Sequence, residues 1–128
     1  MTKSKKCTPE MKIGRLNKAE QFLRAAQLIS SSIDDSQLAN AYVTLCVHAG
    51  IAASDLICCS RLGEYSVGAD HRSAVALLAR IDENSSIHLK TLLDMKGHSG
   101  YSEFAASPQV RISAGISATE LVEQAKLA

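Results

Sequence analysis

The sequence has no tryptophan, three tyrosines, two phenylalanines and only two prolines. A fold built from many short strands needs more β-forming side chains and more turn residues than this, so the composition favours helices. The chain has 128 residues, of which 46% are hydrophobic and 21% are charged. That length is enough to bury one hydrophobic core and too short for two, so we expect a single domain.

A strong charge of either sign is also missing, because the net charge is +1 at pH 7. The molecule as a whole therefore has no field that would indicate a nucleic-acid partner. The charge is uneven, since residues 1–24 carry seven Lys and Arg against two Glu. We predict that residues 1–8 form a basic, disordered N-terminal arm, which either contacts phosphates or is simply a solvated tail.

Sequence signals for secretion and for metal-binding cysteine pairs are also missing. The segment MTKSKKCTPEMK lacks the apolar centre of a secretory signal, so we expect a cytoplasmic protein that starts near Met1. The cysteines have no C-x-x-C spacing, and three of them lie in an apolar helical pattern, so we expect reduced thiols in the core. Because the histidines are scattered singly, we expect no metal and no cofactor. The residues concerned are Cys7, Cys46, Cys58 and Cys59, and His48, His71, His88 and His98.

Apolar residues recur at three- and four-residue spacing along most of the chain, which predicts five helices. They span residues 9–31, 36–62, 71–81, 85–96 and 108–126. The expected caps are Thr8, Ser36 or Asp35, Asp70 and Ser107 at helix N-termini, and Gly97 at the end of the fourth helix. Short connections between consecutive helices imply antiparallel neighbours. The predicted fold class is therefore all-α, a single-domain antiparallel up-and-down bundle of four to five helices over residues 9–127.

The second predicted helix is the longest and most apolar. Polar residues interrupt its apolar run, which favours a buried core helix over a membrane span. Gly50 in its middle indicates close approach, either of another helix or of the same helix in a second subunit. The polar residues recur at about four-residue spacing, so they either line a pocket or are hydrogen-bonded groups of the core or of an interface. This polar stripe consists of Asn40, Thr44, His48 and Asp55.

The stretch DMKGHSGYSEF, residues 94–104, is the most unusual in the chain. Its glycines match neither a Walker A loop nor a dinucleotide-binding loop, and GHSG is not a nucleophile elbow. We expect a polar turn over residues 96–102, just ahead of a helix N-terminus, which either holds an anion or only caps and packs the helices on either side. The candidate ligand-binding residues are Lys96, His98, Ser99, Tyr101 and Ser102.

Three features together resemble the HEPN domain superfamily, and more specifically its small stand-alone actinobacterial members. They are the order of elements, the Ala-rich segment AYVTLCVHAGIAASDLICCSRLGE, and the turn LLDMKGHSGYS before a last helix ending in ATELVEQA. The resemblance covers roughly residues 10–126. It implies a helical bundle that forms a homodimer. Many HEPN domains are metal-independent ribonucleases of toxin–antitoxin or defence systems, with an Arg, four to six residues and then a His as their active site.

On this sequence the HEPN motif falls on Lys96 and Tyr101. Lysine lacks the planar fork that binds phosphate through two hydrogen bonds, and tyrosine cannot exchange a proton near neutral pH as histidine does. The resemblance therefore implies a non-catalytic HEPN-like protein that binds a nucleotide, RNA or a protein partner such as a nucleotidyltransferase. Two alternatives stay open, a divergent ribonuclease that uses His98 and a purely structural interaction module.

Overall fold

A computed structural model describes all residues except 1–3, 32–34, 68–70 and 102. Over the described residues the chain forms five α-helices, one short 3-10 helix (η1) and two three-residue strands. The predicted all-α class is confirmed. The elements are β1 (Ser4–Lys6), α1 (Pro9–Ser30), η1 (Asp35–Leu38), α2 (Ala39–Leu62), β2 (Glu64–Ser66), α3 (His71–Ala79), α4 (Glu83–Tyr101) and α5 (Pro108–Leu127).

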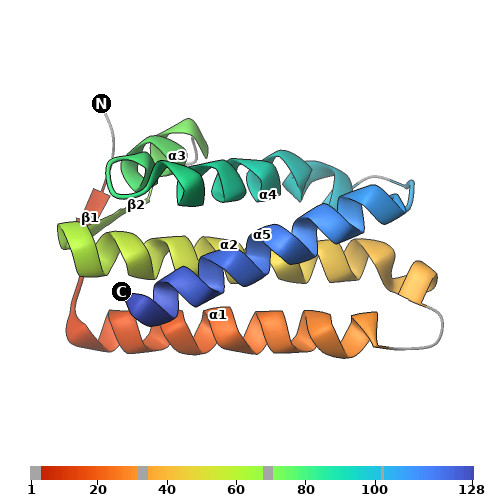
Figure 1. The fold of residues 1–128 in the computed structure, drawn as a ribbon, viewed down its shortest axis with the longest axis horizontal. Coiled ribbons are helices and arrows are strands. Elements are labelled where there is room, and N and C mark those ends of the chain that lie inside the picture. The colour runs from red at the N-terminus through yellow and green to blue at the C-terminus, as the bar shows by residue number, and fades with distance from the viewer. Residues whose placement is uncertain (1–3, 32–34, 68–70, 102) are drawn as a thin grey trace.

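The four long helices run alternately in opposite directions, as an up-and-down bundle requires (Figure 1). The central helix is α2, which packs against α1, α4 and α5. The last helix, α5, crosses α2 obliquely, whereas α1 lies alongside α2 (Figure 1). The short helix α3 packs on α4 and β2 at one end of the bundle. This arrangement leaves α2 facing α3 and α4 on one side.

Helix α2 is long and apolar enough to cross a membrane by length and composition, and it is the only such helix in the part of the chain that the structure describes. However, 67% of its most apolar window is buried inside the protein. Its interior residues include Val43, Cys46, Val47 and Ala53. The interpretation of α2 as a core helix is supported.

Two helix starts follow the predicted capping chemistry. The Thr8 hydroxyl accepts a hydrogen bond from the backbone N–H of Met11 at 3.2 Å, and Pro9 occupies the first turn of α1. The Ser107 hydroxyl likewise accepts from the N–H of Val110 at 3.2 Å, ahead of Pro108. Both caps are confirmed because each depends only on residues within one helical turn.

Two other boundaries differ from the prediction. The N-cap position of α2 is Leu38, which makes no side-chain cap, so the expected cap at Ser36 or Asp35 is wrong and η1 precedes the helix instead. Helix α4 begins at Glu83, not at residue 85, because Asp82 accepts hydrogen bonds from the N–H of Asn84 at 3.2 Å and the hydroxyl of Ser85 at 2.7 Å. The predicted cap at Asp70 lies outside the described residues.

The end of α4 is the largest difference from the predicted elements. Helix α4 continues through Gly97 and Gly100 to Tyr101, so the expected polar turn over residues 96–102 is helical as far as residue 101. Gly97 is therefore not a left-handed cap. Among the described residues the backbone takes a positive φ only at Gly63, with φ 76°, where it ends α2.

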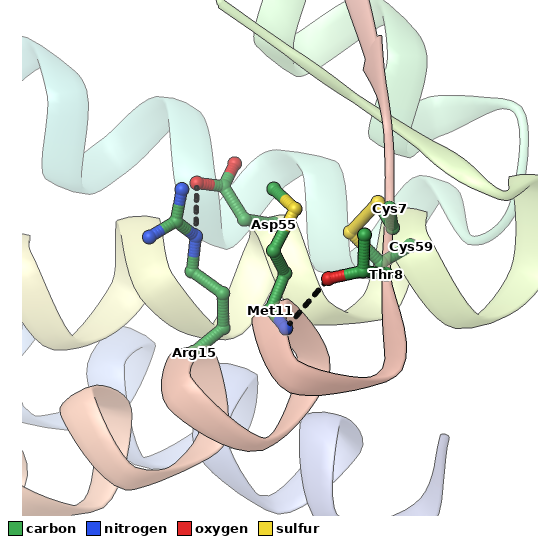
Figure 2. Close-up of a disulfide and its surroundings, with 6 residues drawn as sticks. All are labelled: Cys7, Thr8, Met11, Arg15, Asp55 and Cys59. Carbon is green, nitrogen blue, oxygen red and sulfur yellow. Dashed lines mark hydrogen bonds and ion pairs between the residues drawn. A yellow bond between two sulfur atoms is a disulfide. The ribbon is translucent and has the colours of Figure 1, made fainter.

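The N-terminal arm also differs from the expectation of disorder. Strand β1 pairs antiparallel with β2, with Lys5 opposite Tyr65, and the N–H of Cys7 donates to the carbonyl of Gly63 at 3.0 Å. Cys7 forms a disulfide with Cys59 near the end of α2, with a Cα–Cα distance of 5.6 Å (Figure 2). The prediction that these two thiols are reduced is wrong, whereas Cys46 and Cys58 are free and buried. Residues 1–3 of the arm lie outside the described part.

Candidate functional site

Two of the predicted ligand-binding residues, Lys96 and His98, line different pockets. Because successive residues of an α-helix are rotated by about 100°, the side chains of Lys96 and His98 leave α4 about 200° apart. Lys96 lines a cavity between α2, α3 and α4. His98 lines a different pocket, beside Asp94 and Ser107.

Ser99 is a structural residue of the packed interior. It is buried, its hydroxyl oxygen lies 3.1 Å from the Thr44 hydroxyl, which donates to it, and it donates weakly to the Lys96 carbonyl at 3.4 Å. This contact joins α2 to α4 near the end of α4. The side chain of Tyr101, and Ser102 as a whole, lie outside the described residues.

The polar stripe on α2 divides between several partners. The Asn40 side chain accepts from the N–H of Ala106 at 2.8 Å and donates to the carbonyl of Phe104 at 2.9 Å, which fastens the segment between α4 and α5. The His48 ring lies 5.4 Å from that of Phe22 on α1. Asn40, Thr44 and His48 therefore contact other elements of the fold. Asp55 alone of the four lines the cavity.

The α2–α3–α4 cavity is the best-formed candidate site, with a volume of about 240 Å³. Each helix contributes residues at the three- and four-residue spacing of one helical face. Ser66 of β2 adds to the wall. The described residues that line it are Ile51, Ser54, Asp55 and Cys58 from α2, Ser66 from β2, His71, Ala74 and Leu77 from α3, and Leu89, Leu93 and Lys96 from α4.

The cavity wall carries two hydroxyl groups that lack partners. Ser54 is only 4% exposed, and the Oγ atoms of both Ser54 and Ser66 are buried without a hydrogen-bond partner among the described residues. A buried hydroxyl normally has a partner, because leaving it unpaired costs on the order of 1–3 kcal/mol. These two groups are therefore available to a bound molecule.

Asp55 is the acidic group of the cavity, and its side chain is 21% exposed. Burial raises its pKa to about 6, while the nearby Arg15 opposes this shift. Arg15 Nε lies 3.5 Å from Asp55 Oδ2 in ion-pair rather than hydrogen-bond geometry (Figure 2). The Arg15 guanidinium also lies 5.1 Å from the centroid of the Tyr65 ring. The Asp55 charge is thus compensated from the α1 side.

The free thiol of the cavity is not a nucleophile at neutral pH. Burial, reinforced by the Asp55 charge, raises the pKa of Cys58 to about 12. The thiolate is the reactive form of cysteine, and at this pKa it is scarcely populated. Cys58 is therefore a small apolar wall residue.

Two basic side chains reach the cavity from exposed positions. Lys96 and His71 both line it while remaining solvent-exposed, which places them at its mouth. In the described part of the chain, Lys96 Nζ makes no ion pair. Within the same residues, no group of three or more His, Cys, Asp or Glu side chains is placed to hold a metal ion.

Lys96 and Asp55 were predicted in two separate sites, the polar turn and the polar stripe, and the fold brings both to one cavity. Ser54, Ser66 and His71 were missed as site residues. The helical spacing of Ile51, Ser54, Asp55 and Cys58 was visible in the sequence, but the contribution of α3 and β2 depends on tertiary packing.

A scan against protein-family models finds no matching family, and a search of the curated proteins finds no match either.

Proposed function

We propose that this chain is a non-catalytic, HEPN-like helical binding protein whose ligand site is the α2–α3–α4 cavity. The observation that carries this proposal is the pair of unpartnered buried hydroxyls, Ser54 and Ser66, on the wall of a preformed cavity. A concave, mostly apolar site with a few polar groups is the usual form of a small-molecule site. The cavity thus takes the place of the site predicted at residues 96–102, and Lys96 belongs to both.

The size of the cavity limits the ligand. Sites for drug-sized molecules occupy about 300–1,000 Å³, and this cavity has about 240 Å³. A complete nucleotide would extend out of the cavity through its open mouth. The ligand is therefore a smaller metabolite, in place of the nucleotide or RNA expected from the resemblance alone.

The chemistry of the cavity supports binding over catalysis. The Cys58 thiol is protonated, and the Asp55 carboxylate is occupied by Arg15. Outside the cavity, His98 leaves α4 on a different face from Lys96, so a ribonuclease site combining these two residues has no geometric support.

A fragment screen tests the binding function. We expect small molecules to give saturation-transfer NMR signals with the wild-type protein and to lose them with Ala74→Trp, which fills the cavity from α3, where Ala74 is partly exposed. Ala74→Leu is the milder second variant in case the tryptophan disturbs folding, and circular dichroism checks both. Ligands that bind equally to wild type and to both folded variants would contradict the proposal.

An RNA titration in the presence of a chelator tests the catalytic alternative on the same samples. We expect labelled single-stranded RNA and tRNA to remain intact. New RNA fragments that are absent with the His98→Ala variant would show that the protein is a metal-independent ribonuclease, and would contradict the proposed non-catalytic function.

We further propose that the protein forms a homodimer through the groove between α4 and α5. This groove presents three exposed isoleucines, Ile87, Ile112 and Ile116. Beneath them, His88 Nδ1 and Ser117 Oγ lie 3.0 Å apart and join the two helices. An exposed apolar cluster of this kind is typical of a protein–protein interface.

A further inference from the structure

The charges that line the α2–α3–α4 cavity are not equally compensated. The Asp55 carboxylate is paired with Arg15, which approaches from α1. The Lys96 ammonium has no ion-pair partner among the described residues, and the His71 imidazole adds a second basic group at the exposed mouth. Among the described lining residues, the charge that remains for a ligand to neutralise is therefore positive.

The polar and apolar parts of the cavity are separated along its length. Helices α2 and α4 run antiparallel with Gly50 against Leu92, so Lys96 extends beyond the Ile51 end, while Leu89 lies near Ser54. The eight residues of helix from Ile51 to Cys58 span about 10 Å. The cavity thus has a basic end at Lys96, an apolar middle and, further along α2, the Ser54 hydroxyl.

We propose that the cavity binds a small organic carboxylate, with its carboxylate at Lys96, its apolar body against Ile51, Leu89 and Leu93, and a hydroxyl or carbonyl group at Ser54. This inference rests on the proposed binding function and specifies its ligand class. The Lys96 ammonium compensates one negative charge. A phosphate dianion would bring a second negative charge that no second Lys or Arg among the described lining residues compensates, which favours a carboxylate.

Isothermal titration with chosen probes tests the ligand class. The probes are phenylacetate, its neutral counterpart phenylacetamide, the dianion phenyl phosphate, and para-hydroxyphenylacetate, which adds a hydrogen-bonding group at the far end. We expect phenylacetate to bind more tightly than the amide and the phosphate. We expect para-hydroxyphenylacetate to bind most tightly, by about fivefold over phenylacetate, because its hydroxyl reaches Ser54.

Two substitutions assign the contacts. Lys96→Met keeps the apolar stem but removes the charge, and it should weaken phenylacetate binding about tenfold with little effect on phenylacetamide. The matched control is Lys90→Met, on the same helix but away from the cavity. Ser54→Ala should abolish the advantage of para-hydroxyphenylacetate over phenylacetate.

The outcomes separate the two proposals. If the amide binds as tightly as phenylacetate, and both are lost with Ala74→Trp, the cavity binds ligands but the carboxylate assignment is overturned. If no carboxylate probe binds while other fragments do so in a manner sensitive to Ala74→Trp, the assignment is again overturned and the binding function stands. If neither carboxylates nor other fragments bind, both proposals fail.

Discussion

Gly50 is a point of close packing between α2 and its neighbours α4 and α5. A Cβ atom built there would overlap Leu92 Cδ1 of α4 and would lie 3.2 Å from Leu121 Cδ1 of α5. Both leucines are fully buried and have little room to move. Of the two explanations left open for this glycine, close approach of another helix within the chain is the one that the structure supports.

The first prediction concerns this contact. Gly50→Ala should lower the free energy of unfolding by about 1 kcal/mol, because overpacking costs about 1–3 kcal/mol and the better helix propensity of alanine returns about 1 kcal/mol. Gly14→Ala is the matched control, since Gly14 lies in α1 with open space around it. It should raise the free energy by up to about 1 kcal/mol. Urea denaturation measures both, and equal effects of the two substitutions would refute the packing argument.

Asp55 supplies a second prediction, on pH dependence. Its pKa rises from 3.8 in the unfolded chain to about 6 in the fold, so the folded protein binds this proton more tightly. The contribution of Asp55 to stability therefore falls as the pH rises from about 4 to about 6, by at most about 3 kcal/mol, and then stays constant.

Asp55→Asn should remove this pH dependence. Relative to wild type, the variant should gain stability steadily between about pH 4 and about pH 6, as measured by urea denaturation at several pH values. The control is Asp94→Asn, because Asp94 is a surface carboxylate paired with Lys90. Parallel pH profiles for wild type and Asp55→Asn would show that burial does not raise this pKa.

Among single residues, two helix caps could be predicted from the sequence because each depends only on residues close by in the chain. Thr8 and Ser107 cap their helices because each cap needs only the N–H three residues further on. Gly97 was wrongly expected to end α4, since a glycine can continue a helix when tertiary contacts hold the next turn. Here Ser99 is buried and bonded to Thr44 of α2, 55 residues earlier in the chain.

Between elements, the disulfide Cys7–Cys59 connects the N-terminal arm to the end of α2. This pairing could not be predicted, because the two cysteines are 52 residues apart and follow no recognised spacing. Their proximity results from the pairing of β1 with β2 and from the antiparallel packing of α1 on α2. The candidate cavity was missed for the same reason, since α3 and β2 complete it only in the folded chain.

The third prediction concerns this disulfide. Closing a loop of this length is expected to stabilise the fold by about 2–4 kcal/mol, mainly by restricting the unfolded chain. Cys7→Ser should lower the free energy of unfolding by that amount. Cys7 is the cysteine to replace because it is less buried than Cys59, so the serine itself disturbs the packing less. Under reducing conditions, wild type should lose the same stability and the variant should not change. A wild-type protein that is indifferent to reductant would contradict the prediction.

For the molecule as a whole, the exposed isoleucines of the α4–α5 groove form the basis of the proposed homodimer. Helix α2, which was predicted to be the core, is covered by α1, α4 and α5 and leaves little apolar surface for a second subunit. The exposed apolar side chains of the groove, Ile87, Ile112 and Ile116, instead belong to the outer helices α4 and α5. A second copy that covers them would remove this surface from water, which favours association by roughly 25 cal/mol for each Å² of apolar surface buried.

The fourth prediction follows from this surface. The double substitution Ile112→Glu and Ile116→Glu should convert a dimer into a monomer in sedimentation velocity, because two carboxylates would have to be buried without partners. Thermal unfolding of the variant should remain cooperative, since both side chains are exposed within one chain. Ile13→Glu on α1 is the matched control, because Ile13 and Ile112 are each 64% exposed. A wild-type protein that sediments as a monomer would refute the homodimer. A control variant that dissociates equally would show that the subunits do not meet specifically at the α4–α5 groove.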